Sequence, residues 1–145
     1  MKFYWTKNYQ IGLKMISDTF TQINNLTIDR VKPLLIIDAD EVLVLFASHF
    51  SIYLKKLGWD LNLKGYRLDD AITNLKDGHV ADKVTYKNLI SNFIRDETIR
   101  QPEVVGASKA LNTFNTRANI IILTNVPNTS YNDRVKNLKN LGMSY

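Results

Sequence analysis

The sequence predicts an α/β fold, a parallel sheet whose first two strands are separated by a mainly helical stretch. Two unbroken apolar runs, residues 34–37 and 120–123, each end in polar residues, as strands buried on both faces of a sheet do. Between them, apolar residues recur every three or four positions, which indicates amphipathic helices. At 145 residues with 45% apolar content, the chain is long enough for one domain with a hydrophobic core.

The first half of the chain alternates helical and strand patterns. Residues 9–25 have the spacing of a leading amphipathic helix, and the first core strand follows Pro33. Helical spacing returns over residues 42–57, and Gly58 is the expected end of that helix. A pair of acids then predicts the start of a short helix over residues 69–75, because Asp favours helix N-termini.

The second half holds three more helices and the second core strand. One helix is marked by apolar residues at helical spacing, namely Tyr86, Leu89, Ile90, Phe93 and Ile94. Another is expected over residues 104–114, after Pro102. The strand that ends at Thr124 comes next, and Thr129 or Ser130 is expected to cap a last helix that ends at Gly142.

Polar groups follow both predicted core strands. The first strand is followed by Asp38-Ala39-Asp40 and the second by Thr124-Asn125. Ligands of parallel α/β sheets collect at the carboxyl ends of strands, so we expect Asp38 and Thr124 to converge on a space the size of one phosphoryl group. The alternative for the acids is an Asx turn with a helix cap, and for Thr124 a capping or turn residue.

The segments LLIIDADEVL and IIILTN together resemble the haloacid dehalogenase-like (HAD-like) hydrolase superfamily. Its first motif is an apolar strand followed by Asp-x-Asp, and its second is a strand that ends in Thr or Ser. Glu41 and Val42 depart from the commonest form, which has Gly and Thr there. The resemblance implies a Rossmann-like core from residues 1–45 and 102–145, with a helical cap from residues 46–101 that covers the active site and selects the substrate.

The same resemblance implies a reaction and a role for each site residue. Asp38 would be the nucleophile that forms an aspartyl-phosphate and a ligand of Mg²⁺, and Asp40 the general acid and base whose backbone carbonyl also binds the metal. Thr124 and the amide of Asn125 would bind phosphoryl oxygens. Backbone amides just after Asp38 would complete the phosphate cradle, with little restriction on the side chain at Ala39.

Magnesium would reduce the repulsion between the carboxylate nucleophile and the phosphate. Two like unit charges at about 4 Å repel by roughly 4 kcal/mol at an effective dielectric constant near 20. A carboxylate therefore reaches a phosphate more easily when a cation lies between them, and Mg²⁺ binds the oxygens of both. The chain has no cysteine, which excludes thiolate sites and leaves oxygen and imidazole ligands.

Two later motifs that the resemblance implies, a lysine and an acidic pair, are not found after Thr124. Lys136 and Lys139 are better explained as solvated surface of the last helix. We therefore expect a C-terminally truncated chain, with the remaining strands and metal ligands beyond Tyr145. His49 and His79 lack companions at metal-ligand spacing and are expected to be structural or surface residues.

Composition narrows the class of protein and of partner. The chain has neither an apolar run of about 20 residues nor the pattern of a signal peptide, so we expect a cytoplasmic protein without membrane contact. The net charge of +5 suits a small phosphorylated substrate; nucleic acid is possible but not favoured.

Three functions follow, in decreasing order of support. The first is a Mg²⁺-dependent phosphate-monoester hydrolase. The second is a catalytically inactive HAD-like remnant that binds a phosphorylated ligand or nucleic acid. The third is a mainly helical interaction domain in which both apolar runs are buried helices.

Overall fold

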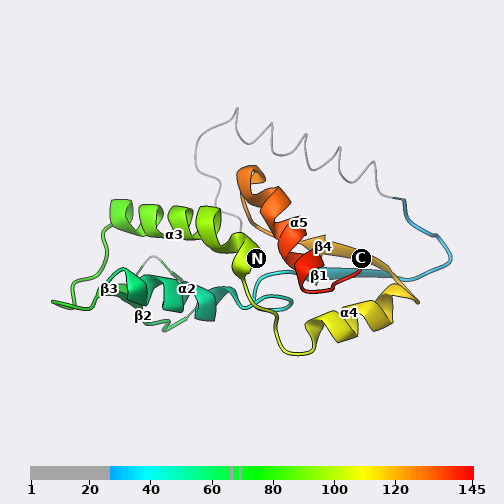
Figure 1. Cartoon of the computed structure of the whole chain (residues 1–145), viewed down its shortest axis with the longest axis horizontal. Coiled ribbons are helices and arrows are strands. Elements are labelled where there is room, and N and C mark those ends of the chain that lie inside the picture. Colours follow the sequence, from blue (N-terminus) through cyan, green and yellow to red (C-terminus); the bar gives the residue numbers. More distant parts are fainter. Residues whose placement is uncertain (1–26, 66, 69) are drawn as a thin grey trace. The chain divides into compact units, whose positions relative to one another are not determined.

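The computed structural model describes residues 27–65, 67–68 and 70–145, and Lys32–Tyr145 forms a compact unit within the chain. This unit has an α/β fold with a small parallel sheet and surrounding helices, shown in Figure 1. The helix predicted over residues 9–25 lies outside the described residues. In the described part of the chain, no helix is both long and apolar enough to cross a membrane.

The parallel sheet consists of β1 (Leu34–Asp38) and β4 (Asn119–Leu123), whose pairing is visible in Figure 1. Their register sets Leu34 opposite Asn119 at one end and Asp38 opposite Leu123 at the other. Both predicted core strands are confirmed. The mainly helical domain considered as a third hypothesis is therefore wrong, because both apolar runs are strands.

The expectation that the first strand is buried on both faces is wrong. Ile37 and Ile122 pack against the hydrophobic core, whereas Ile36 on the other face is 56% exposed. Successive side chains of a strand point to opposite faces, and the core cluster covers one face of this sheet. The apolar run therefore produces a strand that is buried on one side within the described residues.

The cluster beside the sheet is built by α4 (Ala107–Asn115), α5 (Tyr131–Asn140) and the segment after β1. Its buried members are Leu43, Val44, Ala107, Leu111, Leu138 and Met143. The predicted helix over residues 104–114 starts later, at Ala107, because the amide of Val104 donates to the carbonyl of Leu43 next to an isolated bridge between Val44 and Glu103. Ser130 occupies the N-cap position of α5, but its side chain makes no capping hydrogen bond, contrary to the prediction.

The region between the two core strands contains α2 (Phe46–Lys56), α3 (Lys83–Glu97) and a second, antiparallel sheet of β2 (Trp59–Leu61) and β3 (Ile72–Asn74). The short helix predicted over residues 69–75 is wrong. Ile72 is fully buried and pairs with Leu61, so cross-strand packing decides its conformation. The inserted region is thus mixed rather than purely helical.

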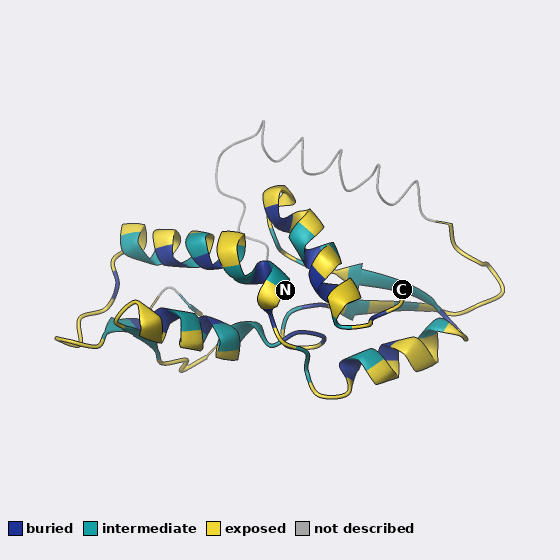
Figure 2. Ribbon diagram, viewed as in Figure 1, coloured by how far each residue is buried: buried dark blue, intermediate teal, exposed yellow. Residues whose placement is uncertain are grey.

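A second hydrophobic cluster holds this inserted region together. Figure 2 shows the buried faces of α2 and α3 among their exposed positions. The buried residues of the cluster are Phe50, Leu54, Ile72, Ala81, Leu89 and Phe93. All six lie within the predicted cap of residues 46–101, whereas the first cluster draws on residues 43–44 and 107–143. The cap boundaries themselves stay a prediction.

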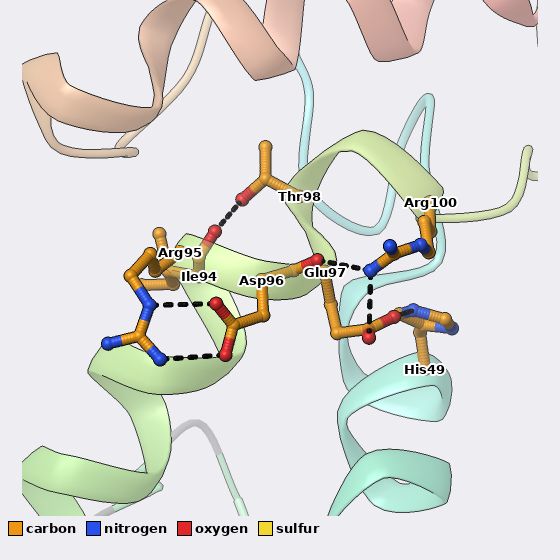
Figure 3. Close-up of polar contacts among 7 residues, drawn as sticks. All are labelled: His49, Ile94, Arg95, Asp96, Glu97, Thr98 and Arg100. Atoms are coloured by element: carbon orange, nitrogen blue, oxygen red, sulfur yellow. Dashed lines mark hydrogen bonds and ion pairs between the residues drawn. The ribbon is translucent and has the colours of Figure 1, made fainter.

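A group of polar contacts lies at the C-terminal end of α3, as Figure 3 shows. Glu97 accepts a hydrogen bond from Arg100 and pairs with Nε2 of His49 on α2 at 2.9 Å. The hydroxyl of Thr98 donates to the carbonyl of Ile94 at 2.6 Å, in the 3₁₀ turn η1 (Thr98–Arg100). His49 is thus a structural residue, as predicted, and it joins the two helices of the inserted region.

Candidate active site

The two predicted motifs meet where β1 and β4 end. The amide of Ala39 donates to the carbonyl of Leu123 at 2.8 Å, so the ladder continues one residue past Asp38. Asp38 is exposed at this edge of the sheet, and Thr124 follows directly after Leu123. The Thr124 hydroxyl is buried and has no hydrogen-bond partner within the described residues, whereas Asn125 is exposed.

A tight turn follows β1 and positions the second acid. The carbonyl of Ala39 accepts from the amides of Leu43 and Val44, at 2.9 and 3.0 Å, and the amide of Glu41 donates to Val44. None of these bonds uses the carbonyl of Asp40. The carbonyl of Asp40 therefore stays outside the bonds that hold the turn together.

The expected role of Ala39 needs two corrections. Its amide is bonded to Leu123, so this amide is not a free donor for a phosphate cradle. Its side chain is fully buried, so the site has no room for an arbitrary residue at this position. The amide of Ala39 is already used in the hydrogen bonding between the two strand ends. The packing of the turn against the core limits the size of the side chain at this position.

Glu41 occupies a left-handed backbone conformation, with φ of 59°. Only glycine adopts this conformation without a steric cost, and glycine is the residue that the commonest HAD-like pattern has here. The Glu41 carboxylate compensates in part by accepting a hydrogen bond from the amide of Ala47, in the first turn of α2. Amides in the first turn of a helix lack partners within the helix, so this contact stabilises its start.

Asp40 forms an ion pair that joins the turn to α5. Its Oδ1 lies 2.7 Å from Nη2 of Arg134, and the side-chain exposures are 27% for Asp40 and 1% for Arg134. Burial raises the pKa of Asp40 above its usual value, the Arg134 charge opposes this shift, and the nearby Asp38 and Glu41 reinforce it. A carboxyl group with a raised pKa is better suited to donate a proton near neutral pH.

Sequence reasoning missed Arg134, although a signal was present. Arg134 precedes Leu138 by four residues and Leu141 by seven, so it shares the apolar face of α5. A single basic residue within an apolar stripe is costly to bury unless it has a partner. The predicted surface positions of Lys136 and Lys139 on the same helix are confirmed, because both are exposed.

The two ends of the inserted region lie side by side next to the turn. The amide of Leu45 donates to the carbonyl of Pro102 at 2.8 Å, and the amide of Val104 donates to the carbonyl of Leu43 at 2.9 Å. The segment that leaves for α2 is thus hydrogen-bonded to the segment that returns from η1. The inserted region departs and returns at the strand end that carries Asp38 and Asp40.

A magnesium ion at this strand end would have few protein ligands. Across residues 27–65, 67–68 and 70–145, no group of three or more His, Asp or Glu side chains is close enough to hold a metal ion. Magnesium, however, is commonly bound by one or two carboxylates plus substrate phosphate, and it retains several waters. The exposed Asp38 carboxylate and the carbonyl of Asp40 are of the chemical type that this binding mode requires.

Comparison of the chain with protein-family models, with curated proteins and with solved structures found no match.

Proposed function

We propose that this protein is a HAD-like phosphohydrolase that cleaves phosphate monoesters through an aspartyl-phosphate on Asp38. The observation that carries the proposal is the juxtaposition of two strand ends. Asp38 is paired with Leu123, so its carboxylate and the hydroxyl that follows Leu123 belong to the same edge of a parallel sheet. Such edges are where ligands of open α/β sheets bind.

In the first step, a carboxylate oxygen of Asp38 forms a bond to phosphorus while the bond from phosphorus to the leaving oxygen breaks. Asp40 donates its proton to that leaving oxygen. In the second step, water attacks phosphorus, Asp40 takes the proton from the water, and the bond between Asp38 and phosphorus breaks. Inorganic phosphate leaves, and both acids return to their first state.

The remaining groups would neutralise and hold the phosphoryl group. Thr124 has a buried hydroxyl without a partner among the described residues, and such a donor gains free energy when an oxygen is brought to it. The backbone amide of Asn125, which is exposed in the next position, would donate to a second phosphoryl oxygen. Mg²⁺, bound by the Asp38 carboxylate and the Asp40 carbonyl, would supply the positive charge that lets the nucleophile approach the phosphate.

The region of residues 46–101 would serve as the cap of this site. It has its own hydrophobic cluster, and its two connections to the sheet are hydrogen-bonded to each other beside Asp40. A cap attached at this place would exclude water and contact the leaving group. The aromatic residues that the structure describes in this region pack in the cluster, so they would hold the cap together rather than mark a substrate.

The test is hydrolysis of p-nitrophenyl phosphate by the purified chain, with and without Mg²⁺. Asp38→Asn keeps the shape of the side chain and removes its nucleophilic charge, so we expect loss of at least 100-fold in kcat. Asp29→Asn, an exposed acid before β1, is the matched control and should keep full activity. Equal rates for Asp38→Asn and the unchanged protein would refute the mechanism.

The same variants separate this proposal from its alternative, a noncatalytic domain that uses its net charge of +5 to hold a phosphorylated ligand or nucleic acid. That alternative predicts binding that weakens steeply with salt and is unaffected by Asp38→Asn. Binding of this kind without any Mg²⁺-dependent hydrolysis would favour it.

A further inference from the structure

The side chain of Arg134 is the most deeply buried charge in the described part of the chain, and it comes from a helix that sequence reasoning assigned no role in the site. Its Nη2 donates to Asp40 at 2.7 Å, across 94 positions of sequence. Arg134 therefore contacts the acid that the proposed function uses for proton transfer, and it is buried whereas Asp38 is exposed.

Asn137 fixes the orientation of the guanidinium. Its Nδ2 donates to the carbonyls of Ile99 and Gln101, at 3.2 and 2.9 Å. An amide nitrogen is the only end of Asn that can face two carbonyls, so its Oδ1 must face the other way. There it accepts a hydrogen bond from Nη1 of Arg134 at 3.3 Å. The chain of contacts thus runs from the linker after α3, through Asn137 and Arg134, to Asp40.

Stability alone explains this arrangement poorly. The Arg134 side chain is 1% exposed, and its Nε is buried without a hydrogen-bond partner among the described residues, so burial of this cation is only partly compensated. Buried ion pairs are often matched or exceeded in stability by apolar side chains of similar volume. Leu138, on the same face of α5, shows that this part of the core accepts apolar residues.

We propose that Arg134 is a positioning residue: held by Asn137, its guanidinium orients the Asp40 carboxyl so that the group can pass a proton to the leaving oxygen and take one from water. The proposal rests on the proposed function of Asp40. A planar guanidinium suits this task because its donors are fixed relative to one another, unlike the single rotating ammonium of lysine.

The orientation of Asp40 matters most when the leaving group is poor. An alkoxide needs a proton in order to leave, whereas p-nitrophenolate leaves readily without one, so a general acid contributes more to the hydrolysis of an alkyl phosphate. Because the guanidinium of Arg134 holds the Asp40 carboxyl at 2.7 Å, its loss is expected to slow an alkyl phosphate more than p-nitrophenyl phosphate.

The test uses Arg134→Gln, Arg134→Lys and the control Lys136→Gln, which removes the same charge from an exposed position of the same helix. For Arg134→Gln we expect a fall in kcat of roughly 10- to 100-fold on glycerol 2-phosphate with KM changed less than 3-fold, and a smaller fall on p-nitrophenyl phosphate. Arg134→Lys should show the same dependence on the leaving group, because the charge stays and the orientation is lost.

A measurement that needs no turnover separates this proposal from the proposed function. In urea unfolding, the losses of stability in Arg134→Gln and Asp40→Ala should be non-additive in the double variant, whereas those of Lys136→Gln and Asp40→Ala should add. If Asp38→Asn leaves hydrolysis unchanged, the nucleophile proposal fails while this cycle still decides the contact. Additive losses for Arg134 and Asp40, equal falls in kcat on both substrates, or full kcat in Arg134→Lys would overturn the role of Arg134. If Arg134→Gln does not fold, Arg134→Lys decides alone.

Discussion

Replacement of Phe93 by alanine would remove the ring at the centre of the cluster between α2 and α3. Phe93 is 0% exposed, and its ring centroid lies 4.7 Å from that of Phe50 and 5.2 Å from that of Phe46. Truncation of a buried Phe to Ala costs about 3–5 kcal/mol, and aromatic pairs add roughly 0.5–1.5 kcal/mol each. We expect a loss near the upper end, about 4–5 kcal/mol, because the ring contacts three aromatic rings of α2, those of Phe46, Phe50 and Tyr53.

The assay is urea unfolding followed by circular dichroism, with the free energy of unfolding obtained by linear extrapolation. Phe114→Ala on α4 is the control, because its side chain is 51% exposed and its removal should cost about 1 kcal/mol or less. If Phe93→Ala lost no more than Phe114→Ala, the packing described for the inserted region would be wrong.

Three further predictions concern the turn after β1. Ala39→Leu should destabilise the protein by about 1–3 kcal/mol in urea unfolding, because a fully buried alanine has no room for a larger side chain; an unchanged midpoint would contradict this. Glu41→Ala should lower the free energy of unfolding by about 1 kcal/mol, because it removes the hydrogen bond to the amide of Ala47. Glu41→Gly should be more stable than Glu41→Ala by about 1 kcal/mol, because glycine tolerates the positive φ. The reverse order would exclude backbone strain at this position. The pKa of Asp40 is raised in the folded state, so its contribution to stability is fully present below pH 3.8 and is lost as the pH rises through the folded-state pKa. The unfolding free energy, measured relative to Asp40→Asn from pH 3.8 upward, should therefore fall. A rise would contradict the shift.

The sequence predicts an element well where one local pattern decides it. Residues 34–37 and 120–123 are continuous β-branched or leucine runs, and both are strands in parallel register. The helix α3 could be predicted because apolar residues recur at helical spacing from Tyr86 to Ile94. Two parallel strands have their carboxyl ends at the same edge of a sheet. The position of Asp38 beside Leu123 could therefore be expected from the sequence.

Other features depend on partners that are distant in the sequence. Ile72 belongs to a strand because Leu61 is available to pair with it, and no local pattern around residue 72 contains that information. The exposure of Ile36 depends on which faces the helices cover. Arg134 becomes part of the site only because Asp40, on another element, stands within hydrogen-bond distance. Such contacts are set by tertiary packing, which overrides local propensity.

At Glu41 the residue type and the backbone conformation give different indications. Its difference from the commonest HAD-like pattern weakens the resemblance when only letters are compared. The left-handed φ shows that the backbone at this position has the conformation that a glycine there would serve. The sequence departs from the pattern while the turn keeps the geometry for which glycine is suited.

Chemical trapping of the nucleophile tests directly whether Asp38 forms an aspartyl-phosphate. The protein is mixed with Mg²⁺ and a phosphate monoester, quenched, and treated with borohydride, which reduces an aspartyl-phosphate to homoserine; peptide mass spectrometry then locates the change. We expect homoserine at position 38 only when substrate and Mg²⁺ are both present, and none in Asp38→Asn. Substrate hydrolysis with Asp38 unmodified, or reduction at another carboxylate, would contradict it.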